Sequence, residues 1–378
     1  MKILVLGTGL VGGPIAADLA RDTNFEVGIA DINPVKMNML GEKYPVKTYC
    51  CDLKNPDMVK EIIKEYDMAV NAVPGFMGFS TLKALTEAGK NVVDIAFFPE
   101  DMFLLDHLAK EKNVTIVSDM GVAPGMSHLL TGYGASMLDK VEKAIIYVGG
   151  LPKIRQWPYE YKAVFSPVDV LEEYTRSARV IENGKEIIKS ALSEAELIDF
   201  PKIGTLEAFV SDGLRSLTKT IPADYMVEKT LRYKGHIELM KIFRESGFFD
   251  TKPVQIQGQW VSPLEFTSKL LFPKWKLEEG EEDITVMQII VEGQKNGRKL
   301  RFTWNLYDTY DKVTETHSMA RTTGYAATAA VRLLASGLYA QKGVSAPEFI
   351  GKHPECVQYM LDRLKERGIC YQETKEDI

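Results

Sequence analysis

Several features that would assign this 378-residue chain to a particular class of protein are missing. No apolar stretch reaches the roughly 20 residues that a transmembrane helix needs, so we expect no membrane span. No run of five basic residues occurs and the net charge is −6, which argues against a nucleic-acid partner. The hydrophobic share of 45% and the charged share of 26% are typical of a globular protein with room for two domains.

Cysteine and histidine are also scarce. The four cysteines are Cys50, Cys51, Cys356 and Cys370, and they form no Cys-x-x-Cys pair. The five histidines lack the spacing of zinc ligands, so the sequence predicts no metal site. This usage favours reduced structural thiols in a cytoplasmic protein.

The most informative segment is the N-terminal run Met1-Lys-Ile-Leu-Val-Leu-Gly7-Thr-Gly9-Leu-Val-Gly12. A short apolar strand leads directly into a glycine-rich turn and then a helix. In this pattern the first glycine permits the tight turn, the second lets backbone approach a pyrophosphate, and the third permits close helix–strand packing. The N-terminus of the helix attracts the phosphates. We therefore expect a dinucleotide to contact Gly7, Gly9, Leu10, Val11 and Gly12.

An acidic residue ends the second predicted strand. Asp31 follows Gly12 at about the 20-residue spacing of a ribose-binding carboxylate. A carboxylate there accepts hydrogen bonds from the ribose hydroxyls and repels a 2′-phosphate. The sequence therefore predicts NAD, rather than NADP, as the cofactor.

Residues 1–125 alternate predicted strands and helices, which indicates a Rossmann-type doubly wound parallel sheet. The predicted strands are 3–6, 26–31, 46–50, 68–73, 91–95 and 114–118, and the predicted helices are 13–21, 34–42, 56–65, 79–89 and 100–111. In such a sheet the ligand lies at the carboxyl ends of the strands. Further cofactor contacts are expected from Asp52, Asn71, Ala72, Val73, Pro74, Ile95 and Met126.

After residue 125 the pattern changes. A strand is predicted over 143–148, a hairpin with an Asn183-Gly184 turn over 179–188, and a strand leading into a helix over 230–245. Strands 284–292 and 299–307 flank a second predicted turn, 293–297. Successive hairpins predict a second α+β domain, residues 126–317, which is built on a mixed or antiparallel sheet, binds the substrate and supports dimerisation.

The C-terminal segment, 318–378, is predicted to be helical over 319–338 and 354–367. Small residues dominate the first of these helices, which would let it lie close against a sheet or another helix. Gly368 is a plausible C′ residue of the second. We expect this segment to pack back on the first domain.

Five further motifs follow the glycine-rich turn in order. They are Gly121-Val-Ala-Pro-Gly-Met-Ser-His128, Tyr147-Val-Gly-Gly-Leu-Pro152, Tyr161-Lys-Ala-Val-Phe-Ser-Pro167, Thr230-Leu-Arg-Tyr-Lys-Gly-His236 and Met319-Ala-Arg-Thr-Thr-Gly-Tyr325. Together they resemble the saccharopine dehydrogenase-like family of amino-acid oxidoreductases, almost from end to end. Five ordered motifs make agreement by chance improbable.

Within that family, details resemble the L-lysine 6-dehydrogenases. The glutamate-forming saccharopine reductases typically carry Leu-Asp-Pro-Gly-Ile-Asp-His where this chain has Val122-Ala-Pro-Gly-Met-Ser-His128, so both acids are absent. Asp31 and the Tyr147–Pro152 segment agree with the lysine enzymes. The loop Asp94-Ile-Ala-Phe-Phe-Pro-Glu-Asp101 departs from them, because theirs is richer in glycine and histidine, and it leaves the substrate open.

The resemblance implies an NAD-dependent oxidoreductase of amino-acid metabolism that deaminates a terminal amine. Its simplest reaction converts L-lysine to 2-aminoadipate 6-semialdehyde and ammonia. One alternative is a saccharopine or carboxynorspermidine dehydrogenase or reductase, and another is a non-catalytic NAD-binding regulatory protein. Family members are commonly dimers, so we expect a homodimer whose other partner is a small amino-acid substrate.

Oxidation of an amine requires a group that takes a proton from the substrate ammonium. Asp94 and Asp119 end predicted strands at the cofactor-binding edge, and His128 closes the motif after the sixth strand. Asp94, Asp119 and His128 are the catalytic candidates. Helix capping or turn stabilisation explains each aspartate equally simply, and a histidine beside apolar residues is usually structural.

A substrate carboxylate is matched best by the planar fork of an arginine. Arg215 lies in an irregular polar loop, and Arg232 lies on a predicted strand. Lys234 and His236 follow Arg232 closely, and Tyr161 is a candidate wall of the pocket. The predicted substrate-binding residues are therefore Tyr161, Arg215, Arg232, Lys234 and His236.

Overall fold

The computed structural model describes residues 1–278 and 280–378, with backbone alone at 167 and 168. The chain divides into two compact units, which are treated separately. The first unit comprises Met1–Ser136 and Ala320–Cys370, and the second comprises Met137–Met319 and Tyr371–Ile378. The predicted fold class is confirmed, because the first unit holds a parallel α/β sheet and the second a mixed sheet.

The sheet of the first unit has seven parallel strands in the order β17-β6-β5-β4-β1-β2-β3. Their bounds are β1 (Lys2–Leu6), β2 (Glu26–Asp31), β3 (Val46–Cys50), β4 (Met68–Asn71), β5 (Asn91–Asp94), β6 (Thr115–Val117) and β17 (Gly343–Ser345). Six of the strands were predicted, and β17 was not. The strand order reverses between β1 and β4, which puts the ligand-binding switch point at the carboxyl end of β1.

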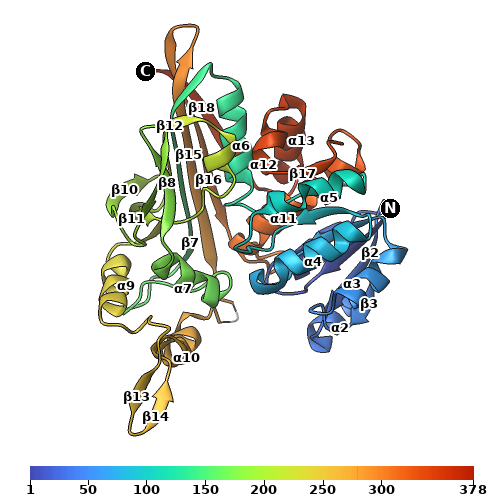
Figure 1. Cartoon of the computed structure of the whole chain (residues 1–378), viewed down its shortest axis with the longest axis horizontal. Coiled ribbons are helices and arrows are strands. Elements are labelled where there is room, and N and C mark those ends of the chain that lie inside the picture. The colour runs from blue at the N-terminus through green and yellow to red at the C-terminus, as the bar shows by residue number, and fades with distance from the viewer. Residues whose placement is uncertain (279) are drawn as a thin grey trace. The chain divides into compact units, whose positions relative to one another are not determined.

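Figure 1 labels most of the helices of the first unit. The helices of this unit are α1 (Gly12–Ala20), α2 (Pro34–Lys43), α3 (Pro56–Ile62), η1 (Ile63–Glu65), α4 (Gly75–Glu87), η2 (Met102–Leu105), α5 (Asp106–Glu111), α6 (Met126–Ser136), α11 (Ser318–Ala335), α12 (Pro347–Gly351) and α13 (Pro354–Lys365). Local sequence explains where several begin. Asn33 and Asn55 cap α2 and α3 through their side-chain oxygens, and each is followed by a proline at the first helical position.

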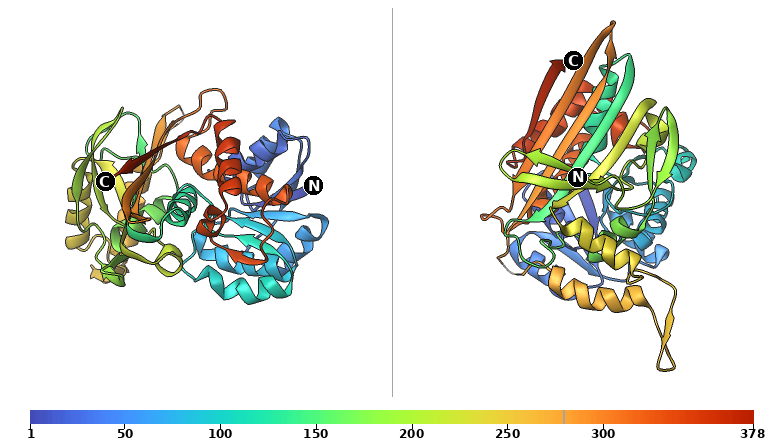
Figure 2. Two further views of the ribbon diagram at one scale, coloured as in Figure 1. Left: turned by 90° about the horizontal axis from the view of Figure 1, so that it is seen from above. Right: turned by 90° about the vertical axis from the view of Figure 1, so that its left-hand side faces the viewer.

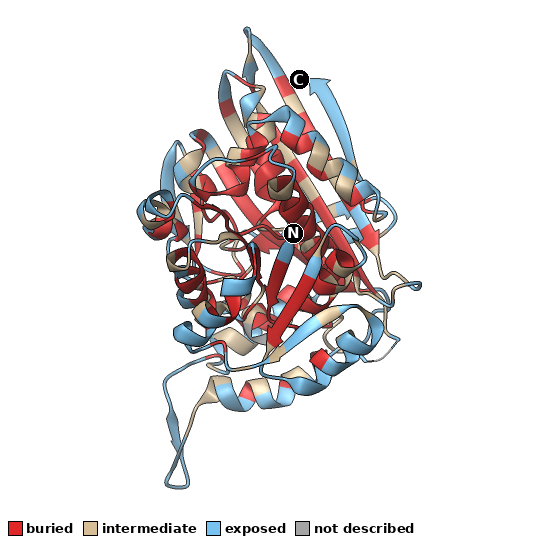
Figure 3. Cartoon of the chain, turned by 90° about the vertical axis from the view of Figure 1, so that its right-hand side faces the viewer, coloured by how far each residue is buried: buried red, intermediate tan, exposed pale blue. Residues whose placement is uncertain are grey.

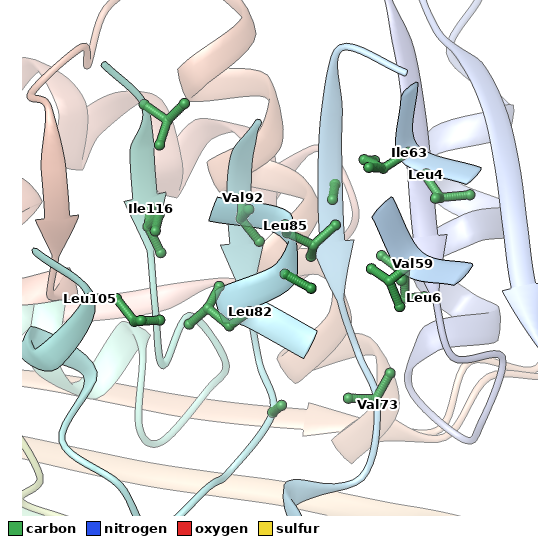
Figure 4. Close-up of a cluster of buried hydrophobic side chains, with 14 of the residues drawn as sticks. Leu4, Leu6, Val59, Ile63, Val73, Leu82, Leu85, Val92, Leu105 and Ile116 are labelled. Atoms are coloured by element: carbon green, nitrogen blue, oxygen red, sulfur yellow. The ribbon is translucent and has the colours of Figure 1, made fainter. Parts of the chain in front are cut away.

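Both faces of the central strands are apolar, as expected for a parallel sheet with helices on either side. On one face, Leu4 and Leu6 of β1 pack with side chains of α3 and α4, including Val59 and Leu82 (Figure 4). Because this core is fully buried, the carboxyl ends of the strands are held in fixed positions. The cofactor turn therefore rests on a rigid base.

The second unit has a nine-stranded mixed sheet in which strands run side by side (Figure 2). Its main path is β10-β11-β12-β7-β15-β16-β18, with β8 pairing β12 and β9 pairing β8. The bounds are β7 (Lys140–Pro152), β8 (Ala178–Glu182), β9 (Lys185–Lys189), β10 (Glu196–Phe200), β11 (Gly204–Val210), β12 (Ala223–Tyr233), β15 (Asp283–Lys295), β16 (Arg298–Thr309) and β18 (Tyr371–Asp377). The remaining elements are α7 (Pro167–Thr175), α8 (Leu217–Thr220), α9 (His236–Glu245), α10 (Pro263–Trp275), and the small hairpin β13 (Val254–Ile256) and β14 (Gln259–Val261).

The first predicted hairpin is confirmed. Asn183 and Gly184 both have positive φ, 50° and 73°, which suits a two-residue type I′ turn between β8 and β9. The second turn is shorter than predicted. It consists of Asn296 and Gly297, and Gly293 lies inside β15 at an irregularity in its pairing with β7. A Cβ at Gly293 would lie 2.0 Å from the Lys140 carbonyl oxygen, so glycine serves close packing there.

Two unit boundaries differ from the predicted ones. Helix α6, residues 126–136, belongs to the first unit, where it packs so closely against α12 that a Cβ at Gly132 would lie 2.5 Å from the Glu348 carbonyl oxygen. Residues 371–377 form β18 beside β16 in the second unit, instead of packing on the first domain with the helices. Strand β18 is almost wholly exposed (Figure 3). Its sequence therefore lacks the alternation of apolar and polar residues from which a strand could have been predicted.

Among the helices in residues 1–278 and 280–378, none combines the length and apolar character that crossing a bilayer requires.

Candidate functional site

The three glycines of the N-terminal turn have distinct environments. Gly7 has φ +94°, and a Cβ there would lie 2.4 Å from the Ala72 carbonyl oxygen. A Cβ at Gly12 would lie 2.0 Å from the Gly7 carbonyl oxygen. A Cβ at Gly9 would meet no atom within 4 Å. Packing thus explains the first and third glycines, whereas the second leaves space beside the backbone that a pyrophosphate can use.

The N-terminus of α1 faces the same turn. Its N-cap residue is Val11, and no side chain caps it. Leu10 is 55% exposed, so the turn lies open to solvent. Backbone N–H groups at such a helix end suit an anion, and the residues present fit a dinucleotide phosphate.

Asp31 is held in place by the glycine-rich turn itself. Its Oδ2 accepts hydrogen bonds from the backbone N and the hydroxyl of Thr8, at 2.6 and 2.9 Å, and its Oδ1 accepts one from the Asn33 backbone N at 2.8 Å. Partial burial raises the pKa of Asp31, but these hydrogen bonds outweigh it and leave the pKa below its ordinary value. Asp31 is therefore an oriented, ionised carboxylate. The role of Thr8 was missed, although it lies inside the motif.

The other predicted cofactor residues differ in their exposure to solvent and in their distance from the glycine-rich turn. Asp52 is exposed, and its Oδ1 accepts a hydrogen bond from the Lys54 backbone N of its own turn. Ala72 and Pro74 follow β4, where Ala72 adjoins Gly7 and Pro74 precedes α4. Val73 and Met126 are buried, and the Ile95 backbone N bonds to the Asn71 carbonyl oxygen. Only the strand-end backbone around Ala72 lies directly beside the glycine turn.

Asp94 joins the ends of three neighbouring strands. It is fully buried; its Oδ2 accepts from the Ser118 hydroxyl at 2.7 Å and its Oδ1 from the Asn71 amide at 2.7 Å and the Ala96 backbone N at 3.3 Å. Burial raises the pKa of Asp94 to about 7, with Asp119 adding to the rise and Ser118 opposing it. Because both oxygens are occupied, this arrangement favours a structural role over proton transfer.

The two other catalytic candidates lie in the buried segment that follows β6. Asp119 has φ +57° and is 2% exposed, and the Met120 backbone N bonds to the Asp94 carbonyl oxygen. His128 is fully buried on α6, with its Nδ1 2.9 Å from the Ser127 hydroxyl. Both residues therefore lie in the interior of the first unit. Their assignment as proton acceptors stays a prediction.

Arg232 and His236 form the centre of a buried aromatic cluster in the second unit. Arg232 pairs with Glu173, donates from Nε to the Tyr174 hydroxyl at 3.1 Å, and lies 4.6 Å from the ring centre of Tyr161. The His236 Nδ1 donates to the Tyr159 carbonyl oxygen, so its Nε2 accepts from the Tyr174 hydroxyl at 2.9 Å.

The electrostatics of this cluster agree with its hydrogen bonds. Burial and the neighbouring Arg232 together lower the pKa of His236 to about 3, so His236 is neutral. Arg232 has partners for Nε, Nη1 and Nη2. These contacts favour a structural role for both residues and leave little of Arg232 for a substrate. Lys234, by contrast, is exposed at the turn before α9.

Arg215 lies in the loop between β11 and α8. It is 7% exposed and has φ +46°, a conformation that is uncommon for a residue other than glycine. Glu228 of β12, which the sequence analysis missed, is close enough for the two charges to affect each other. The available signal was an acid within an otherwise buried strand, just before the Thr230–His236 motif. Within the described part of the chain, no cluster of three His, Cys, Asp or Glu side chains could bind a metal ion.

Comparison with protein families assigns both parts of the chain. Residues 3–117 match the saccharopine dehydrogenase NADP binding domain, and residues 121–369 match the saccharopine dehydrogenase C-terminal domain. The yeast apo saccharopine dehydrogenase (L-Glu forming) has the same fold, with a TM-score of 0.83 at 20% identity and 99% coverage of both chains.

Relatives with known names are distant. The mitochondrial alpha-aminoadipic semialdehyde synthase of Rattus norvegicus is 26% identical over 70% of this chain, and the match spans only 30% of that protein. The NADP(+), L-glutamate-forming saccharopine dehydrogenase of Schizosaccharomyces pombe is 28% identical over 66% of this chain and 58% of its own length. The carboxyaminopropylagmatine dehydrogenase of Synechocystis sp. is 23% identical over 99% of this chain and 97% of its own length.

Proposed function

The chain belongs to the saccharopine dehydrogenase family, and we propose that it is an NAD-dependent dehydrogenase that oxidises a terminal amine of an amino acid. Residues 3–117 form an NAD(P)-binding domain of that family. The substrate we propose is L-lysine, with 2-aminoadipate 6-semialdehyde and ammonia as products. A homodimer, as is common in the family, is part of the proposal.

The choice of NAD depends on Asp31. Its carboxylate is ionised and oriented by Thr8, at the strand end where a ribose-binding acid is expected. A 2′-phosphate at this position would meet a like charge. The matching family domain and the Schizosaccharomyces pombe relative both carry NADP in their names, so this chain is proposed to differ from them in its cofactor.

The proposed reaction is a two-electron oxidation of the carbon that bears the terminal amine. When bound, NAD accepts the hydride that leaves the carbon bearing the amine. The substrate ammonium loses one proton, the carbon–nitrogen bond becomes an iminium, and water converts it to an aldehyde and an ammonium ion. The residues of the glycine-rich turn and Asp31 would hold the cofactor.

Arg215 is the proposed carboxylate-binding residue. Its guanidinium can form two parallel hydrogen bonds with a carboxylate, and the loop that carries it is fastened to β12 through Ser211. We predict that Arg215→Ala raises KM for the amino acid about tenfold or more and leaves KM for NAD unchanged. Arg298→Ala, at the exposed first residue of β16, is the control. Equal effects on both constants would assign Arg215 a structural role.

A second candidate substrate is a carboxylated amine conjugate. It is favoured by the match with the carboxyaminopropylagmatine dehydrogenase, which covers 99% of this chain. The matches with the Rattus norvegicus and Schizosaccharomyces pombe proteins cover 70% and 66%. Saccharopine and carboxynorspermidine belong to the same class of secondary amine.

A cofactor-reduction screen tests these proposals. The purified full chain is mixed with NAD or NADP and with L-lysine, saccharopine, carboxynorspermidine or carboxyaminopropylagmatine, and reduced nucleotide is followed by absorbance. Turnover of lysine with NAD supports the proposed function, and turnover restricted to the conjugates supports the second candidate. Binding of NAD without turnover of any amine would instead indicate a regulatory protein.

A further inference from the structure

Glu228 differs from the neighbouring acids of the second unit, because one of its carboxyl oxygens has no hydrogen-bond partner. Glu173 pairs with Arg232, and Asp212 accepts two hydrogen bonds from the Arg179 guanidinium, at 2.9 and 3.1 Å, and one from its backbone N at 3.1 Å. Glu228 is 5% exposed, and its Oε2 has no hydrogen-bond partner. A buried carboxyl oxygen without a partner is costly, so it requires an explanation.

The loop that carries Arg215 is fastened to β12 beside this acid. The Ser211 backbone N donates to the Glu228 carbonyl oxygen at 3.1 Å, and the Thr230 hydroxyl donates to the Ser211 hydroxyl at 2.9 Å. A Cβ at Gly213 would lie 1.6 Å from the Glu228 Oε1, so a glycine lets the loop lie against this carboxyl group without displacing it. The loop therefore brings an arginine and an acceptor oxygen into one neighbourhood.

The α-end of an amino acid carries an ammonium group and a carboxylate, which require an acceptor and a cationic donor. We propose that Glu228 accepts a hydrogen bond from the α-ammonium group of the substrate while Arg215 binds its α-carboxylate. The pair would select amino acids over simple amines. This inference rests on the proposed function, because it assigns the recognition of the amino-acid end of the same substrate.

The ionisation of Glu228 gives the proposal a measurable signature. Burial raises the pKa of Glu228 to about 8, Glu173 and Asp212 add to the rise, and Arg215 opposes it. At neutral pH the free carboxyl group therefore holds its proton, and binding an ammonium group must release that proton. Affinity for the amino acid should therefore increase as the pH rises towards 8, by up to about tenfold per pH unit, and level off above pH 8.

Calorimetric titration of the full chain with bound NADH, which cannot accept a hydride from the ligand, tests this. The ligands are L-lysine, 6-aminohexanoate, which lacks the α-amino group, and 1,5-diaminopentane, which lacks the α-carboxylate. The wild-type protein should bind lysine at least about tenfold more tightly than either analogue. Lysine binding at pH 7 should release a proton, seen as a dependence of the heat on the ionisation enthalpy of the buffer.

Glu228→Gln should remove the preference for lysine over 6-aminohexanoate, the proton release and the pH dependence. Glu186→Gln, at an exposed acid of β9, should change none of them. Gly213→Ala offers a second route, because its methyl group would displace the flexible end of Glu228 while leaving both charges in the chain. It should weaken the preference even if Glu228→Gln folds poorly.

The inference is overturned if the wild-type protein binds lysine and 6-aminohexanoate equally, binds neither, or keeps its preference and proton release in both variants. Failure of the proposed function is a separate result. A protein that binds lysine with proton release but never reduces NAD with it retains the Glu228 site and loses the proposed reaction. A protein that oxidises lysine with unchanged discrimination in both variants loses only the Glu228 site.

Discussion

The hydrogen bonds around Asp31 orient its carboxylate and keep it ionised, which suits it to bind the ribose of NAD. Thr8 donates two hydrogen bonds to a single oxygen of the carboxylate, which orients the group and keeps it ionised. We predict that Asp31→Ala weakens NAD binding by about tenfold to a hundredfold, the range for losing hydrogen bonds to a charged group. The same change should strengthen NADP binding relative to NAD, because the repulsion of the 2′-phosphate is removed.

Fluorescence titration of both nucleotides measures this change in preference. Glu42→Ala, which removes an exposed acid from α2 of the same unit, should leave both affinities unchanged. If Asp31→Ala alters neither affinity, Asp31 does not bind the ribose and the choice of NAD loses its basis.

At this scale, sequence reasoning predicted local features and missed those that depend on folding. Gly7 and Gly12 have the close contacts that their spacing predicted, and Asp31 ends β2, while the binding of the cofactor by these residues stays a prediction. The engagement of Arg232 by Glu173 joins residues 59 positions apart, and no local pattern reveals it. Glu228 was missed for the same reason, because its significance depends on which loop covers it.

In the turn between β1 and α1, one glycine position is expected to matter for cofactor binding and another for folding. A methyl group at position 9 meets no atom within 4 Å, whereas one at position 12 would collide with the Gly7 carbonyl oxygen at 2.0 Å. We predict that Gly9→Ala leaves the thermal unfolding temperature nearly unchanged and reduces NAD affinity by at least about tenfold, because the backbone can no longer approach the pyrophosphate closely. Gly12→Ala should lower the unfolding temperature markedly, since helix and strand must separate.

Differential scanning calorimetry and NAD titration on the two variants distinguish these effects. A Gly9→Ala protein that unfolds as early as Gly12→Ala would mean that position 9 serves packing. A Gly9→Ala protein with undiminished NAD affinity would place the pyrophosphate elsewhere.

Elements with periodic or turn signals were predictable, and elements defined by partners were not. The strands of the first sheet and the Asn183-Gly184 hairpin follow from local patterns. By contrast, β17 has three residues and becomes a strand because it pairs in parallel with β6, more than two hundred positions earlier in the chain. The charged and exposed β18 is likewise recognisable only beside β16.

At the scale of the whole molecule, the first unit is assembled from two distant parts of the chain. A buried ion-pair network joins them. Asp18 of α1 is 6% exposed and accepts hydrogen bonds from the Thr328 hydroxyl at 2.6 Å, from Arg332 Nη1 at 2.8 Å and from Arg367 Nε at 2.7 Å. This one carboxylate therefore connects α1 with α11 and with the residues that follow α13.

We predict that Asp18→Ala lowers the stability of the first unit by about 3–5 kcal/mol, because the buried guanidinium group of Arg332 and the partly buried one of Arg367 lose a shared partner. Asp22→Ala is the matched control. Its carboxylate also contacts Arg332, at 3.2 Å, but it is more exposed, so its loss should cost no more than about 1 kcal/mol. Two units need not unfold together, so hydrogen exchange of the amides of α1 and α11 is the appropriate measure. Faster exchange confined to α1 in the Asp18 variant would show that α11 stays folded without this network, and it would refute the idea that the network unites the two parts of the unit.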